Sequence, residues 1–273
     1  MWTSVPQLKF NSNFFSKCED LGCLETYVTV TKLLLLYDGP MHKFILEIPS
    51  NFPIQRKLFN EWILFLSRKG VKHLELSDAL ESLMSGCPLL EKLIIFHCSG
   101  FQHVNVHAPT LKVFHVYDSE VIKSISLKHK HNLIELILSA NTLVNNVEGG
   151  WVCDLLKGLL KIERLCLGRG YFKSKRDAVE PQVISKEFES IDCCFSRLQI
   201  VKLEVETEYK HALNLIRLVL AKASSLKVLS FKVGFGLSRS EAPILLGISR
   251  DLLRMKRAST AVEVIFFYEG LVE

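Results

Sequence analysis

Cysteine and histidine side chains gather in the middle of the chain, at Cys87, His97, Cys98, His103 and His107. Thiolate and imidazole groups are zinc ligands, and structural zinc sites draw on closely spaced ligand pairs. The chain contains no Cys-x-x-Cys pair. The alternation in "HVNVH" predicts a strand, which would set His103 and His107 about 13 Å apart. We therefore expect no metal and no other cofactor, and interpret Cys87 and Cys98 as turn residues before and after an apolar strand.

Three further motifs suggest chemistry, and each has a structural interpretation that we favour. The adjacent Cys193 and Cys194 would form a strained ring if oxidised, whereas buried thiols act as small apolar side chains. "LGRGYFKSKR" (167–176) holds Gly-x-Gly and four basic residues but lacks the context of a phosphate-binding loop, so we expect a solvated loop that contacts a partner. "KRAS" (256–259) looks like a phosphorylation site but is predicted to be a turn. Serine, histidine and acidic residues form no hydrolase arrangement, so no enzymatic activity is expected.

A six-residue frame, seen in "LEKLII" (90–95), recurs along the chain as apolar, two polar, leucine, any residue, apolar. The central apolar residues are separated by 19 to 36 residues, and most steps lie near the period of leucine-rich repeats. The other copies, some with a different central residue, are "VKHLEL" (71–76), "LKVFHV" (111–116), "LIELIL" (133–138), "IERLCL" (162–167), "LQIVKL" (198–203) and "LKVLSF" (226–231).

The frame predicts a short strand that cannot be stable by itself. Its last two apolar residues, such as Leu93 and Ile95, point to one face, and the first, Leu90, enters from the preceding turn. Stacked neighbours must cover that face, as they do in solenoids. Helix-like stretches separate the frames: "DALESLMSG" (78–86), "WVCDLLKGLL" (151–160) and "HALNLIRLVLAKAS" (211–224). We expect an α/β fold, an irregular leucine-rich-repeat solenoid of short parallel strands alternating with helices.

The overall composition is that of an ordinary soluble globular protein. It has 273 residues, of which 48% are hydrophobic and 23% charged. The net charge of +5 is spread thinly, so no nucleic acid is expected as a partner. No apolar run approaches the roughly 20 residues that span a bilayer, and we expect no membrane contact. Eight cysteines without a secretory signal favour a reducing compartment, the cytoplasm or the nucleus.

The order of several motifs resembles plant F-box proteins that carry leucine-rich repeats and an FBD domain. "CPLLEKLIIFHC" (87–98) followed by "APTLK" (108–112) is similar to successive repeats of that family. "CCFSRLQIVKLEVE" (193–206) and "LLRMKRASTAVEVIF" (252–266) are similar to the FBD domain, with Arg257-Ala258-Ser259 at a turn before the last strand. "MWTSVPQLKF" (1–10) is similar to the segment that follows, and slightly overlaps, an F-box.

The resemblance implies three parts: residues 1–12 as the C-terminal edge of an F-box, 13–190 as a leucine-rich-repeat array, and 191–273 as an FBD-like segment that closes it. In the family the F-box binds the Skp1 adaptor of an SCF-type ubiquitin ligase, and the repeats hold the protein to be ubiquitinated. We expect the Skp1-binding helices to be missing from residues 1–273. The alternative is a stand-alone repeat scaffold, or a truncated gene product, that binds a partner without ubiquitination.

Residues that alternate with the buried ones are expected to line one continuous sheet face and to bind an unknown protein there. Two interpretations stay open for Phe96, His115 and Tyr117: they are interface anchors, which are often aromatic, or neighbouring loops cover them. The candidate partner-binding residues are Lys92, Ile94, Phe96, His115, Tyr117, Glu135, Arg164 and Lys202.

Overall fold

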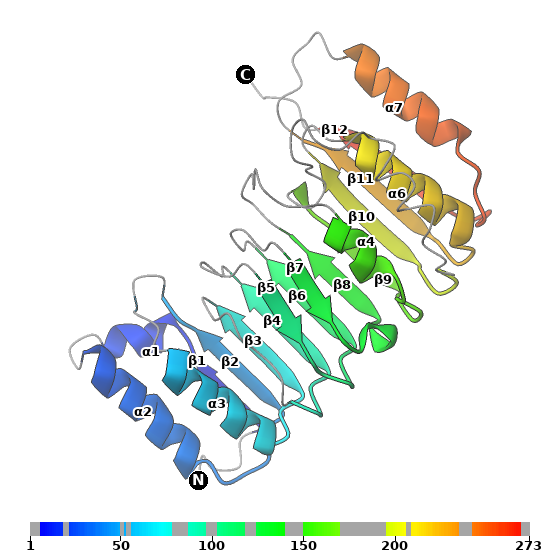
Figure 1. Ribbon diagram of the computed structural model, residues 1–273. Helices are drawn as coiled ribbons and strands as arrows, with labels where there is room; N and C mark the ends of the chain where they lie inside the picture. The colour runs from blue at the N-terminus through cyan, green and yellow to red at the C-terminus, as the bar shows by residue number, and fades with distance from the viewer. Residues whose placement is uncertain are drawn as a thin grey trace. The chain divides into compact units, whose positions relative to one another are not determined.

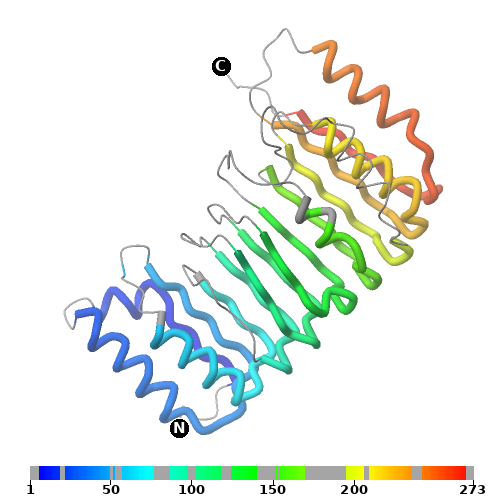
Figure 2. The backbone as a smooth tube through the Cα atoms, in the orientation of Figure 1, coloured from blue at the N-terminus to red at the C-terminus, as the bar shows by residue number. Residues whose placement is uncertain are grey.

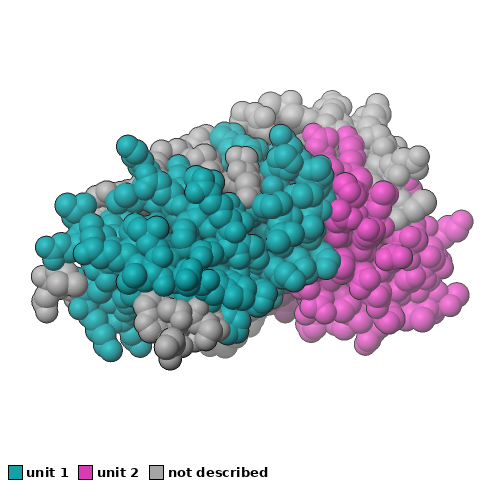
Figure 3. All heavy atoms as spheres, turned by 90° about the horizontal axis from the view of Figure 1, so that it is seen from below, with its two compact units in different colours: residues 1–129 teal, residues 130–273 magenta. Residues whose placement is uncertain are grey.

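The computed structural model divides into two compact units, residues 1–129 and 130–273, which Figure 3 distinguishes by colour. The domain boundaries expected at residues 12 and 190 stay predictions. The structure describes residues 6–18, 22–49, 52, 56–77, 87–96, 103–117, 124–139, 150–169, 195–205, 209–234 and 242–268.

Five parallel strands with matched registers form the sheet of the first unit. They follow one another in chain order, with β5 and β7 set apart as a second, two-stranded parallel sheet. Figure 1 shows α2 and α3 on one face of the first strands. The elements are β1 (Gln7–Phe10), α1 (Ser12–Lys17), α2 (Cys23–Leu36), β2 (Lys43–Glu47), α3 (Arg56–Arg68), β3 (His73–Ser77), β4 (Lys92–Phe96), β5 (His103–Val106), β6 (Val113–Tyr117) and β7 (Ser124–Leu127).

The second unit repeats the arrangement with five more parallel strands, and Figure 2 traces its strands side by side. Helix α6 buries the predicted stripe of Leu215, Ile216, Val219 and Leu220. The elements are η3 (Lys130–Asn132), β8 (Glu135–Leu138), α4 (Gly150–Leu156), β9 (Arg164–Leu167), β10 (Ile200–Val205), α6 (Tyr209–Lys222), β11 (Val228–Val233), α7 (Ala242–Arg254) and β12 (Glu263–Tyr268).

The seven predicted frames coincide with strands β3, β4, β6, β8, β9, β10 and β11. In the frame that contains β4, Leu90, Leu93 and Ile95 are 0%, 0% and 4% exposed, and the corresponding residues of the other frames are almost fully buried as well. The parallel α/β repeat predicted from the frame is therefore present within each unit.

A repeated turn starts these strands. The backbone N–H of the first apolar residue donates to the carbonyl three residues earlier, as from Leu90 to Cys87 over 3.2 Å and from Leu111 to Ala108 over 3.1 Å. Cys87 is 2% exposed, and burial raises the pKa of its thiol to about 11. Cys87 is thus an apolar turn residue, as expected, and its thiol stays protonated at neutral pH.

Three strands, β1, β2 and β7, were not recognised from the sequence. Strand β2 follows the same frame through Met41, Phe44 and Leu46, all at most 1% exposed. Strand β1 lies inside residues 1–12, the expected edge of an F-box, and pairs in parallel with β2. The segment around β1 is therefore part of the sheet.

The last turn before β12 is structural. Ser259 is 7% exposed and donates its Oγ–H to the carbonyl of Leu226 over 2.6 Å. A phosphoryl group on Ser259 would break this buried bond. The predicted closure of the array is not seen among the described residues, because β12 ends the run of strands and Phe267 is 49% exposed.

Candidate protein-binding surface

The face of the first sheet opposite the buried leucines is formed by alternate strand residues, and we call it the open face of the first unit. Strand register aligns these residues in rows across β2, β3, β4 and β6. One row is Lys43, His73, Lys92 and Val113; the next is Ile45, Glu75, Ile94 and His115; Glu47, Phe96 and Tyr117 lie in the third.

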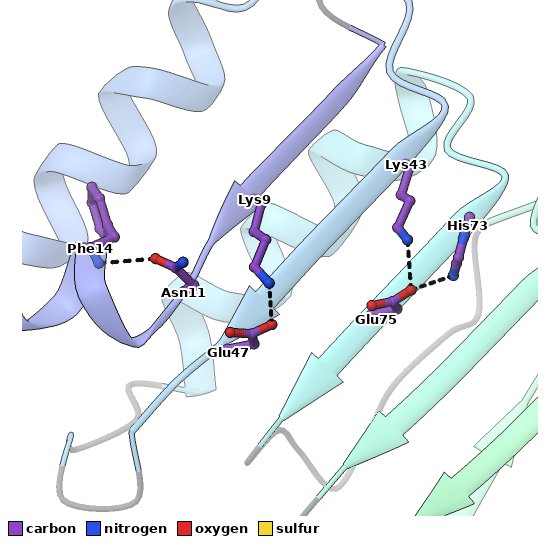
Figure 4. A network of polar contacts seen from close by, with 7 residues as sticks. All are labelled: Lys9, Asn11, Phe14, Lys43, Glu47, His73 and Glu75. Carbon is purple, nitrogen blue, oxygen red and sulfur yellow. Dashed lines mark hydrogen bonds and ion pairs between the residues drawn. The ribbon is translucent and has the colours of Figure 1, made fainter.

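A polar network occupies the N-terminal side of this open face (Figure 4). The Nζ of Lys43 and the Nε2 of His73 both lie 2.8 Å from Oε1 of Glu75. Lys9 on β1 reaches Glu47 on β2 over 2.7 Å. The two glutamates are thus each paired with a lysine.

Directly after β1, helix α1 starts at a capped position. The side-chain Oδ1 of Asn11 accepts a hydrogen bond from the backbone N–H of Phe14 over 3.1 Å. Asparagine is a preferred N-cap residue because this bond satisfies a helix N–H that has no partner within the helix. The cap fixes where the chain leaves β1.

His73 is held neutral by its surroundings. Burial lowers its pKa from 6.5 to about 4, the positive charge of Lys43 adds to the lowering, Glu75 opposes it, and Lys92 lowers it further. Burial is thus the largest cause of the lowered pKa, and the charges of Lys43 and Lys92 act in the same direction. Lys92, which is half-buried, forms no ion pair with a described residue.

The pH dependence of stability should report this environment. Between pH 6.5 and about 4, unfolded His73 binds a proton that folded His73 does not, so the free energy of unfolding should fall as the pH falls through this window. His73→Gln should flatten that part of the profile, measured by urea denaturation at a series of pH values. His42→Gln is the matched control, because His42 is exposed. Identical profiles for wild type and His73→Gln would contradict the assignment.

Aromatic side chains occupy the C-terminal side of the open face. The rings of Phe96 and Tyr117 stack with centroids 5.3 Å apart and planes 15° apart. Tyr117 also meets His115 edge-on, and its hydroxyl lies 3.3 Å from Nδ1 of His115. Phe96 and Tyr117 remain partly exposed, whereas Ile94 and His115 are each 7% exposed. Of the predicted aromatic cluster, His115 is thus covered and the stacked pair is accessible.

The other three candidate residues lie on the second unit. Arg164 on β9 is paired with Glu135 on β8 over 3.2 Å, and Lys202 on β10 is exposed. A hollow beside this pair has a volume of about 100 Å³, well below the roughly 300–1,000 Å³ of typical small-molecule sites. It is lined by Ile134, Glu135, Glu163, Arg164, Gln199 and Ile200.

The structure describes only some of the other residues singled out for chemistry. Within the described ranges, no three or more His, Cys, Asp or Glu side chains are placed to hold a metal ion. His103 contacts Ser124 over 2.7 Å, and His107 stacks on His129 at 4.9 Å. His97, Cys98, Cys193, Cys194 and most of the loop at 167–176 lie outside the described residues.

Comparison with known proteins shows which proteins these strands resemble. Residues 70–151, from just before β3 into α4, match the family model described as "FBD-associated F-box protein At5g56370, LRR repeats". The F-box/FBD/LRR-repeat protein At1g13570 of Arabidopsis thaliana is 26% identical over 170 residues. The predicted resemblance to plant F-box/FBD/LRR-repeat proteins is confirmed. The alignment covers 54% of this chain and 40% of that F-box/FBD/LRR-repeat protein.

No solved structure matches the chain significantly. None of the helices in the described parts of the chain is both long and apolar enough to cross a membrane. The leucine-rich-repeat match covers β3, β4 and β6, so it includes the strands that carry Lys92, Phe96 and Tyr117.

Proposed function

We propose that residues 1–273 form a protein-interaction module that holds a partner protein on the open face of the first unit. The observation that carries this proposal is the partly exposed stack of Phe96 on Tyr117 beside Lys92. Aromatic side chains presented on a rigid element are typical interface anchors, because they bury a large area at a small cost in conformational entropy. The parallel pairing of β3 with β4 and of β4 with β6 holds the pair in place.

The composition of the face supports recognition rather than catalysis. Glu47 and Glu75 are neutralised by lysines, while Lys92 keeps a positive charge that is not paired with a described residue. A partner segment with an apolar or aromatic side chain next to an acidic one would complement this face. The candidate contact residues remain Lys92, Ile94, Phe96, His115 and Tyr117, with Glu135, Arg164 and Lys202 as candidates on the second unit.

We further propose that the module corresponds to the substrate-recognition part of an SCF-type ubiquitin ligase receptor, with residues 13–190 as the repeat array and 191–273 as an FBD-like segment. The similarity to F-box/FBD/LRR-repeat proteins supports this role. We expect residues 1–273 by themselves not to form a stoichiometric complex with Skp1, as measured by co-purification. Such a complex would contradict the assignment of these residues to the recognition part.

Affinity capture tests the recognition role. Immobilised residues 1–273 should retain a specific protein from plant extract, and the double variant Phe96→Ala/Tyr117→Ala should lose it. Glu61→Ala is the matched control, because Glu61 is exposed on α3, away from the open face. The captured protein is then offered to a reconstituted SCF assembly in which an F-box is fused before residue 1. Ubiquitination is the expected result; retention without ubiquitination would favour the stand-alone scaffold, and equal capture by both variants would refute the surface.

A further inference from the structure

Helix α2 presents an apolar stripe to solvent on the side away from the sheet. Leu24, Val28 and Leu35 are 62%, 43% and 69% exposed, while Tyr27 and Leu34 on the other side are each 1% exposed. At about 100° per residue, these three side chains fall within an arc of about 40°, whereas Leu36, which is 63% exposed, lies outside it at about 120° from Leu24. The three within the arc form one row about 16 Å long, at about 1.5 Å per residue.

This stripe is unusual for a helix that covers a sheet, because such helices normally turn polar residues outward. The neighbouring helix α3 exposes Lys57, Asn60 and Glu61 together with a single leucine, Leu64. The Nε1–H of Trp62 on α3 donates to Oγ1 of Thr31 on α2 over 2.9 Å, which ties the two helices together. The stripe therefore lies on a helix that its contact with α3 holds in place.

Two opposite charges flank the stripe on the same side. Glu25 and Lys32 lie about 100° and 80° around the helix from Leu24 and are two turns apart. Both side chains are exposed, and neither forms an ion pair with a described residue. The midpoint between Glu25 and Lys32 lies within about 1.5 Å along the axis of the midpoint between Leu24 and Leu35, so the charges are placed nearly symmetrically about the middle of the stripe.

We propose that α2 pairs with α2 of a second copy of this chain, antiparallel and related by a two-fold axis. In this arrangement Leu24 faces the partner's Leu35, and Val28 faces the partner's Thr31. Glu25 then lies about 3 Å along the axis from the partner's Lys32, within reach of both side chains, and the two-fold axis repeats every contact.

Charge excludes the simplest competing arrangements. A parallel two-fold pair would put Glu25 and Lys32 of one helix on the opposite side of the interface from those of the partner, so no ion pair would form across it. A helix that lies on a lipid surface is typically rich in Lys and Arg on its polar face, whereas the two charges beside this stripe cancel. Only the antiparallel pair satisfies the stripe and both charges together.

The contact is small, so the dimer is weak. A single helical stripe buries less than the roughly 1,200 Å² of a standard stable interface, which corresponds to a dissociation constant on the order of micromolar or above. Sedimentation velocity from about 1 to 200 μM is therefore the appropriate measurement, because it covers a micromolar equilibrium. A concentration-dependent shift from monomer to dimer is the expected result.

Variants of α2 test whether the dimer forms through the apolar stripe. Leu35→Glu should leave a monomer throughout the concentration range, with the thermal midpoint unchanged because Leu35 is exposed. Leu64→Glu is the matched control on α3, also at an exposed leucine, and should still dimerise. Glu25→Lys and Lys32→Glu should each weaken the dimer about tenfold, since two ion pairs become repulsive. The double reversal Glu25→Lys/Lys32→Glu should restore wild-type affinity.

Two results would overturn this inference. A wild-type chain that stays monomeric up to the highest concentration has no such interface. A dimer that tolerates Leu35→Glu and both charge reversals uses a different surface. Co-sedimentation of a monomer with phosphatidylcholine–phosphatidylserine vesicles, lost in Leu35→Glu, would instead assign the stripe to lipid. The open face of the first unit is unchanged in every variant, so failure here leaves the proposed partner binding standing.

Discussion

Unfolding of the Leu93→Ala variant is expected to require about 2–5 kcal/mol less free energy than unfolding of the wild-type chain. Leu93 is 0% exposed in the middle of β4, and its registered neighbours Leu74 and Phe114 are also 0% exposed. Truncation to alanine removes three buried carbon atoms and leaves a cavity between strands that hydrogen bonds hold in place. The neighbouring strands cannot close this cavity without losing their register.

Lys92→Ala provides the matched control at the adjacent position of the same strand. The Lys92 side chain lies on the open face, so its loss should change the unfolding free energy by no more than about 0.5 kcal/mol. Urea denaturation followed by the fluorescence of the buried Trp62 measures both variants. Small and equal effects would show that the assignment of core and open faces in β4 is wrong.

The second large effect concerns binding. The double variant Phe96→Ala/Tyr117→Ala is expected to bind the captured partner at least about 30-fold more weakly than the wild type. Truncation of an interface anchor typically costs about 2 kcal/mol or more of binding free energy. Isothermal titration calorimetry with the purified partner measures the loss. Each residue is only half-buried in the free chain, so the fold should survive the change.

Single variants separate the contributions of the two rings. The stacked geometry, with centroids 5.3 Å apart, couples Phe96 to Tyr117, so the single losses should not add up to the double loss. Glu61→Ala on α3 should bind like the wild type. If the affinity of the double variant stays within twofold of the wild type, the aromatic pair is not part of the interface.

Sequence reasoning located most strands because the frame encodes burial directly. Each copy places a leucine-like residue where the structure has a residue that is almost fully buried. Strand β2 was missed although "MHKFIL" (41–46) fits the frame, with Phe44 at the central position as Phe114 is in "LKVFHV" (111–116). The frame defines core positions by size and apolarity, so it includes this strand.

The candidate surface was less predictable, for a physical reason. Alternation along a strand assigns a side chain to a face but says nothing of what covers that face. Ile94 and His115 point to the open face and are nevertheless buried. The contact between Lys43 and Glu75 depends on the register of β2 against β3 and could not be read from one strand. The apolar stripe on α2 likewise could be recognised only from the structure, which shows which side of the helix is buried.

The turn that starts each strand has an evolutionary consequence. The carbonyl of Lys72 accepts from the backbone N–H groups of both Glu91 and Lys92, and the same double acceptance recurs at later strands. Only main-chain atoms form these hydrogen bonds, so they place few constraints on the side chains of the open face. Positions 92 and 96, whose side chains are partly exposed, can therefore diverge by mutation while Leu93 and Ile95 stay fixed. Substitutions at these positions can create a binding site for a new partner without changing the packing of the core.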